Sequence, residues 1–229
     1  MRSDRSARGW AFGFAQDYFG WDSHQASQVT GKDGWRHMLA LWEQHGEAIY
    51  AMPEYVLRQE WFHGLGPTIS RAYPSFFDAL SPSARLLDFG CGTAEVTRRP
   101  WTDAGREAIL MDVESPNLAY VRAKYPQQNV TVRTVREGLP ARYDALVCLD
   151  VLEHIPSPMA VLREVWERLR PGGYALLWFD GSFPAGGHLQ ASIDELPAYD
   201  AWLTTETHIL HQGWVDWVQK PRRWWQVLA

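Results

Sequence analysis

The stretch that decides the fold is Arg85–Thr97, R-L-L-D-F-G-C-G-T-A-E-V-T. An apolar run around Leu86 and Leu87 is interrupted by Gly90-Cys91-Gly92, and residues that can open a helix follow. A short apolar run, a glycine turn and a helix start are typical of a strand that enters the first crossover of a parallel α/β sheet. Glycine has no Cβ, so such a loop can adopt unusual φ/ψ values and let a ligand lie against its backbone.

Two carboxylates mark the ends of neighbouring predicted strands. Asp88 ends the first strand, where a carboxylate is costly to bury unless it has a partner, and Asp112 ends the apolar run Ala108–Asp112. An acidic residue at the tip of the second strand is where nucleotide-binding α/β folds hold a ribose diol. The alternative is a structural turn with incidental glycines. The dinucleotide pattern G-x-G-x-x-G would place its third glycine at Glu95, so a bound pyrophosphate is not supported.

Four motifs follow one another along the chain: D-F-G-C-G-T-A, the acidic strand end at Asp112, Y-D-A-L-V-C-L-D-V-L-E-H-I at 143–155, and L-R-P-G-G-Y-A-L-L at 169–177. Together they resemble the class I S-adenosylmethionine-dependent methyltransferases, in the small-molecule branch that includes the ubiquinone-biosynthesis O-methyltransferases. The resemblance covers roughly residues 83–229. It implies an α/β, Rossmann-like, seven-stranded and mostly parallel sheet with helices on both faces, and S-adenosyl-L-methionine as cofactor.

The resemblance also implies a cofactor-binding set: Asp88, Gly90, Cys91, Gly92, Asp112, Val113 and Asp150. The two glycines would admit the methionine portion of the cofactor, Asp88 would hold the loop or the cofactor amino group, Asp112 would accept both ribose hydroxyls, and Val113 would pack on adenine. Many relatives have an acidic residue after strand three that contacts adenine. The corresponding position is Val135, a mismatch for which Glu137 is the nearest replacement.

Methyl transfer from a sulfonium requires an in-line nucleophile and, for a hydroxyl or an ammonium, removal of a proton. Histidine suits that task near neutral pH. His154 follows strand four and His188 lies in the loop that would form the pocket rim, so these two are the candidate bases. His24 and His63 could approach from the N-terminal region. A structural or surface role is the alternative for each of them.

A metal variant of this site remains open. Asp150, Glu153 and His154 have the spacing D-x-x-E-H, which resembles the acidic cluster proposed to hold magnesium in the ubiquinone-pathway O-methyltransferases. Two carboxylates suit a hard cation that positions and acidifies a phenol. Aspartate replaces the usual glutamate at the first position and shortens its reach. Since nothing else in the sequence requires a metal, the predicted site contains none.

Residues 1–82 are predicted to form an N-terminal aromatic segment and a helical cap that closes the substrate side, with Tyr18 and Trp21 as lid residues. Its helices are expected at 34–47, 54–63 and 69–80, the last with a boundary or kink at Pro74. Residues 83–229 are predicted to form the cofactor-binding domain. Its strands are expected at 108–112, 130–135, 145–149 and 174–179 after the one ending at Asp88, and it closes with a hairpin of Trp214–Val218 and Trp224–Leu228. Exposed aromatic residues of the cap could also form a homodimer surface.

Composition narrows the partners. The net charge is −5 and no run of lysine or arginine occurs, which disfavours nucleic acid as the main substrate. No apolar segment has the length of a signal peptide or a membrane span, and two cysteines without metal-site spacing indicate reduced thiols, so we expect a cytoplasmic protein. The 13 tryptophans fit either an indole-rich core or an aromatic pocket for a flat, apolar or cationic substrate.

The leading hypothesis is therefore methyl transfer to a small-molecule acceptor, at oxygen in the first instance. N-methylation of an amine held by aromatic faces is the alternative within this class. A NAD(P)-dependent oxidoreductase is disfavoured by the missing third glycine and the absence of a Tyr-x-x-x-Lys pair. A cofactor-binding protein without turnover is the third alternative. The sequence does not identify the acceptor.

Overall fold

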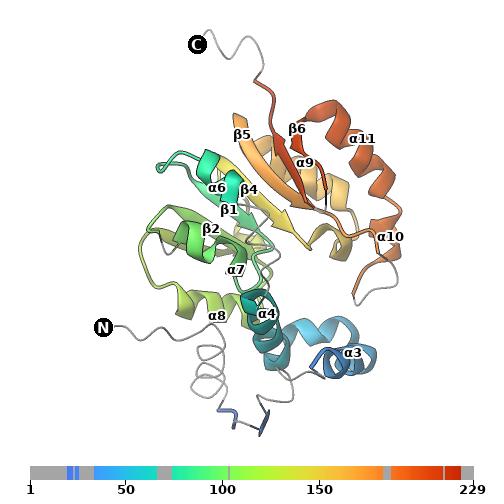
Figure 1. Cartoon of the computed structure of the whole chain (residues 1–229). Coiled ribbons are helices and arrows are strands. Elements are labelled where there is room, and N and C mark those ends of the chain that lie inside the picture. Colours follow the sequence, from blue (N-terminus) through green and yellow to red (C-terminus); the bar gives the residue numbers. More distant parts are fainter. Residues whose placement is uncertain are drawn as a thin grey trace.

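The apolar runs of the sequence build a seven-stranded sheet within the described residues, in the order β3-β2-β1-β4-β5-β7-β6 (Figure 1). The computed structural model describes residues 20–22, 24–25, 34–65, 74–102, 104–182, 187–213 and 215–222. The strands are β1 Leu86–Phe89, β2 Ala108–Asp112, β3 Val130–Thr134, β4 Tyr143–Leu149, β5 Leu169–Trp178, β6 His208–His211 and β7 Asp216–Gln219. β1 to β5 are parallel, whereas β7 is antiparallel to both β5 and β6. The predicted fold class is confirmed.

Both faces of this sheet are covered, which explains why its central strands are continuously apolar. Successive residues of a strand point to opposite faces. Leu86 and Leu110 join one core cluster, while Leu87 and Met111 join the other. The helices on the first side are α6 Pro74–Ala79, α7 Glu95–Thr97, η2 Arg98–Thr102 and α8 Pro116–Lys124; on the second they are α9 Pro158–Arg168 and α11 Leu196–Glu206.

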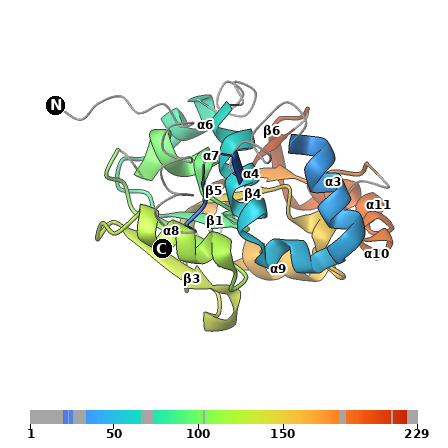
Figure 2. The same cartoon turned by 90° about the horizontal axis from the view of Figure 1, so that it is seen from below.

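Helices α3 Gly34–His45 and α4 Pro53–Leu65, joined by η1 Gly46–Ala51, lie together at one end of the sheet (Figures 1 and 2). Met38, Ile49 and Leu57 form a small apolar cluster of their own there, and Trp21 packs against it. The predicted lid residue Trp21 therefore lies in the packing of this helical cap, and Tyr18 lies outside the described residues. We keep the name cap for α3, η1 and α4. The boundary between residues 82 and 83 stays a prediction.

The predicted helix 69–80 is revised in the structure. Pro74 is the first residue of α6, where a missing N–H costs nothing, and residues 66–73 lie outside the described part of the chain. Phe76 and Phe77 of α6 are buried in the core cluster of the sheet, which Val56 of the cap helix α4 also joins. No helix within the described ranges has the length and apolar character needed to cross a bilayer.

The closing hairpin exists, and the predicted strand Trp214–Val218 corresponds to β7, but its partner differs from the prediction. It pairs β6 with β7, so the first partner precedes Trp214 in the chain, and the predicted strand Trp224–Leu228 lies outside the described residues. All four residues of β6 are exposed at the edge of the sheet, so the strand has no apolar alternation to reveal it. The expected strand 174–179 begins earlier in the structure, because Pro171-Gly172-Gly173 lies inside β5, where its pairing with β4 shifts register. Two helices, α10 Gln190–Ile193 and α11, lie between β5 and β6.

Candidate active site

A cavity of about 480 Å³ lies where the carboxyl ends of β1, β2 and β4 meet the cap. This is the edge at which open α/β sheets bind their ligands. The glycine loop and Asp112 line it from one side, and Asp150 and His154 from the other. Tyr50 of η1 also lines the cavity. Residues far apart in sequence thus enclose a space of the size that small ligands occupy.

The glycine loop is fastened to the end of β2. The backbone N–H groups of Gly90 and Cys91 both donate to the carbonyl of Met111, at 2.8 and 3.1 Å. Gly90 has φ +73° and lies so close to Val151 that an added Cβ would meet its Cγ2 at 2.2 Å. Both the conformation and the close approach require glycine at this position.

Asp112 holds the same loop through its side chain. Its Oδ2 accepts a hydrogen bond from the Gly92 N–H at 2.7 Å, and its Oδ1 accepts one from the Val113 N–H at 2.7 Å. Burial raises the pKa of Asp112 to about 6, although both backbone hydrogen bonds oppose that rise. Each oxygen takes one N–H and keeps lone pairs for a further donor, which is the arrangement a vicinal diol needs. Val113 is 53% exposed beside it.

Asp88 lies beneath the loop. Its carboxylate is 4% exposed and accepts a hydrogen bond from the Thr97 hydroxyl at 3.0 Å. Burial raises its pKa to about 7. The structure therefore ties Asp88 to Thr97, the last residue of α7, which supports the loop from below. At the other edge of the cavity, Val135 contributes to the lining, whereas Glu137 is exposed and accepts from the Thr134 N–H at 2.5 Å. Glu137 thus caps its own turn instead of facing the cavity.

The two candidate bases lie side by side in the structure. His154 belongs to η4 Leu152–His154, and its ring centroid is 5.0 Å from that of His188. His154 Nδ1 is 2.9 Å from the Gly187 carbonyl, and a carbonyl only accepts, so the hydrogen is on Nδ1 and the Nε2 lone pair is available. Burial lowers the pKa of His154, which favours the neutral ring. Of the two histidines expected from the N-terminal region, His24 is exposed, and the side chain of His63 lies outside the described part.

A family profile described as a methyltransferase domain matches residues 61–220. The chain belongs to this methyltransferase family. It is similar to the ubiquinone biosynthesis O-methyltransferases of Paracidovorax citrulli (28% identity over 52% of this chain and 47% of the relative) and Xanthomonas campestris pv. campestris (31% over 42% and 43%). The chain therefore spans about half the length of the curated relatives it matches.

Among solved structures, the methyltransferase is similar to the N-terminal domain of EvdMO1 with SAH bound, at 20% identity, over 70% of this chain and 84% of that one, with a TM-score of 0.47. It is also similar to SAM-bound CalS10, an amino pentose methyltransferase from Micromonospora echinaspora, at 26% identity, over 56% and 59%, with a TM-score of 0.43. The recognised class, the class I S-adenosylmethionine-dependent methyltransferases, is confirmed, and S-adenosyl-L-methionine is the cofactor. The roles of individual residues stay predictions.

The structure adds residues that the sequence analysis of this methyltransferase did not single out. Tyr50 places its hydroxyl 3.0 Å from His154 Nδ1, and Tyr55 of α4 packs edge-on against Tyr50 with ring centroids 5.0 Å apart. Tyr55 also lines the cavity, and burial raises its pKa, with the charges of Tyr50, Asp150 and Asp112 adding to the rise. An aromatic pocket was one of the two explanations for the high aromatic content, but no spacing assigned these two tyrosines to it.

Proposed function

We propose that this chain transfers the methyl group of S-adenosylmethionine to an oxygen atom of a small-molecule acceptor. The observation that carries the proposal is that Asp112, the glycine loop and His154 line the same cavity. The end of the cavity formed by Asp112 and the glycine loop (the cofactor end) and the end that contains His154 (the polar end) therefore belong to one continuous space. A hydroxyl bound near His154 would face the methyl group of a cofactor held by Asp112.

The reaction needs little from the protein beyond positioning and proton removal. The acceptor oxygen forms a bond to the methyl carbon while the carbon–sulfur bond breaks, which leaves S-adenosylhomocysteine as a neutral thioether. The proton of the hydroxyl must go to a nearby base. In the absence of any other ligand, the Nε2 lone pair of His154 is available for it, because the Gly187 carbonyl fixes the hydrogen on Nδ1.

Burial around the cavity supports this chemistry. Tyr50, Tyr55 and Trp178 contribute aromatic surface to the lining and exclude water from the reacting atoms. The same surface is the observation that favours the second candidate function, N-methylation of an amine, because aromatic faces attract an ammonium group. An ammonium group would also have to lose a proton before attack. The two candidate functions therefore use the same fold and differ only in the acceptor.

Two experiments test the proposal. Titration calorimetry with S-adenosylhomocysteine compares wild type with Asp112→Ala and with the matched control Glu114→Ala, a neighbouring exposed carboxylate that pairs with Arg122 on the surface. We expect tight binding that is weakened only by Asp112→Ala. Radiolabelled S-adenosylmethionine is then offered with phenols, catechols and sugars on one side and with primary and secondary amines on the other. Labelled product from hydroxyl compounds supports O-methylation, product from amines alone supports the second function, and no binding of S-adenosylhomocysteine refutes both.

A further inference from the structure

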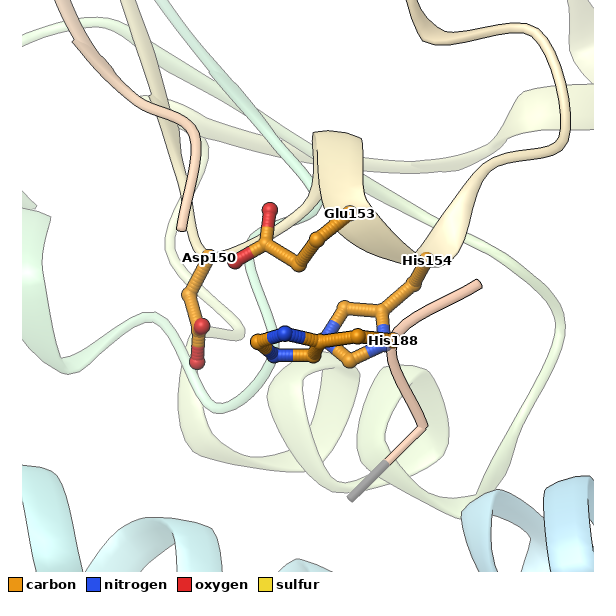
Figure 3. Close-up of side chains that lie close together, drawn as sticks. All are labelled: Asp150, Glu153, His154 and His188. Carbon is orange, nitrogen blue, oxygen red and sulfur yellow. The ribbon is translucent and has the colours of Figure 1, made fainter. Parts of the chain in front are cut away.

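Four potential metal ligands meet at the polar end of the cavity (Figure 3). One ligand atom from each of Asp150, Glu153, His154 and His188 lies within 4.8 Å of all the others. Asp150 follows β4, Glu153 and His154 belong to η4, and His188 comes from the segment between β5 and α10. The backbone of that segment is joined to η4, because the Leu189 N–H donates to the Glu153 carbonyl at 2.9 Å. The fold therefore holds the four side chains together.

Glu153 supplies the observation that points to a bound ion. Its side chain is 0% exposed, and neither carboxylate oxygen has a hydrogen-bond partner among the described residues. Figure 3 shows this carboxylate directed toward Asp150. A buried carboxylate that is neither paired nor hydrogen-bonded is strongly destabilising, and in proteins such groups are paired or coordinate metals. A second carboxylate nearby increases that cost, and a divalent cation bound between the two would offset it.

The two imidazoles are oriented in the way that metal-binding histidines usually are. His154 Nδ1 lies 2.9 Å from the Gly187 carbonyl, and His188 Nδ1 lies 2.6 Å from the Ser182 carbonyl. Since both carbonyls only accept, each Nδ1 carries the hydrogen and each Nε2 presents a lone pair. Metal-ligating histidines typically donate their other N–H to a backbone carbonyl or carboxylate, which fixes the ring and its tautomer.

We propose that Asp150, Glu153, His154 and His188 bind one divalent transition-metal ion, and that the loop after β5 supplies His188 as the fourth ligand. The magnesium cluster that the spacing D-x-x-E-H resembles involves only three of these residues, Asp150, Glu153 and His154. Magnesium prefers oxygen ligands and retains several waters. Two imidazoles with two carboxylates favour Zn²⁺, Mn²⁺, Fe²⁺ or Co²⁺ instead. The added histidine thus changes the class of ion that the cluster selects.

This inference does not depend on which acceptor is methylated. A divalent ion at this place would lower the pKa of a coordinated hydroxyl, which is the proton removal that O-methylation requires. With the ion bound, His154 and His188 would serve as ligands. The proposed function and the metal site can therefore fail separately: S-adenosylhomocysteine binding tests the first, and metal binding tests the second.

The test uses the full chain, stripped of metal with a chelator and titrated in a calorimeter with Zn²⁺, Mn²⁺ and Mg²⁺. We expect one Zn²⁺ per chain, bound more tightly than Mg²⁺. His188→Ala should weaken the binding of Zn²⁺ by at least about tenfold and reduce the preference of the site for Zn²⁺ over Mg²⁺. His208→Ala, which removes an exposed histidine of β6, is the matched control and should change nothing. Binding of S-adenosylhomocysteine by each variant confirms that it is folded.

A second measurement needs no variant. Cu²⁺ added to the stripped wild-type protein should show two imidazole nitrogens in its pulsed electron paramagnetic resonance spectrum. One imidazole nitrogen, or Zn²⁺ affinity equal in wild type and a folded His188→Ala, overturns the role of His188. Mg²⁺ binding tighter than Zn²⁺ overturns the proposed class of ion, and the absence of binding by every ion overturns the site.

Discussion

The glycine loop offers the sharpest test of the structure, through the pair Gly90→Ala and Gly92→Ala. Both positions have positive φ, +73° and +51°, so each substitution incurs a backbone cost of about 1–2 kcal/mol. Both substitutions also stabilise the protein by the same amount, about 0.4–1 kcal/mol, because alanine lowers the conformational entropy of the unfolded chain. They differ in surroundings: a Cβ at 90 meets Val151 Cγ2 at 2.2 Å and Cγ1 at 2.9 Å, whereas a Cβ at 92 meets nothing within 4 Å.

The steric difference sets the expected magnitude. Overpacking of a tight site costs about 1–3 kcal/mol, so Gly90→Ala should lower the free energy of unfolding by that much more than Gly92→Ala. Urea denaturation of the three proteins measures it. Adding Val151→Ala to Gly90→Ala removes the two offending methyl groups, and a double-mutant cycle should show a favourable coupling of about 1–2 kcal/mol. Equal losses for the two glycine variants, or no coupling with Val151→Ala, would refute the packing described for the loop.

Three further predictions concern the cavity. Asp112→Asn should weaken the binding of S-adenosylhomocysteine by about 10–100-fold at pH 8, because hydrogen bonds to a charged acceptor contribute about 1.5–3 kcal/mol. The affinity of wild type should fall as the pH drops through about 6, where this carboxylate protonates. Calorimetry from pH 8 to 5 measures both effects, and a flat wild-type profile contradicts the prediction. Burial raises the pKa of Asp88 in the folded protein to about 7, so the stability that its protonation contributes is fully present below the unfolded pKa and is lost as the pH rises through 7. Relative to Asp88→Asn, the free energy of unfolding of wild type should increase by up to about 4 kcal/mol from pH 8 to pH 4. Urea midpoints measure this increase, and parallel profiles of the two proteins contradict it. Tyr50→Phe should slow methyl transfer by about 2–10-fold, the range of one net hydrogen bond, without changing S-adenosylhomocysteine affinity; an equal change in both would make Tyr50 a cofactor contact instead.

Local sequence patterns were sufficient to predict the glycine loop and Asp112 as one end of the site. The run from Leu86 through the glycine loop and the acidic end of β2 could be interpreted directly, because strand, turn and helix start follow one another within a few residues. The structure places Asp112 and the loop in direct hydrogen-bond contact, as their positions at neighbouring strand ends require. Such neighbouring strand ends meet through sheet topology alone, and topology follows from the order of the elements.

The acceptor half depends on contacts that no local pattern encodes. Tyr50 reaches His154 across 104 residues of sequence, and its own segment is a short 3₁₀-helix without a distinctive periodicity. His188 was expected at the rim of the pocket, but its contact with His154 depends on the path of the loop after β5. The same limitation explains the misplaced hairpin, since the exposed strand β6 resembles a loop in composition.

We expect acceptor selectivity to depend on the contact between the cap and the loop after β5. Gly187 has φ +88°, and an added Cβ would lie 2.5 Å from Trp42 and 2.8 Å from the Tyr50 hydroxyl, so the cap packs directly on the loop backbone. His154 joins both, because its Nδ1 is within hydrogen-bond distance of the Gly187 carbonyl and the Tyr50 hydroxyl. In the proposed function the cofactor lies at the sheet ends, whereas the acceptor would have to fit a space whose walls are the cap and the loop. We therefore expect changes in these two segments to alter which acceptor is methylated while the methyl donor stays the same.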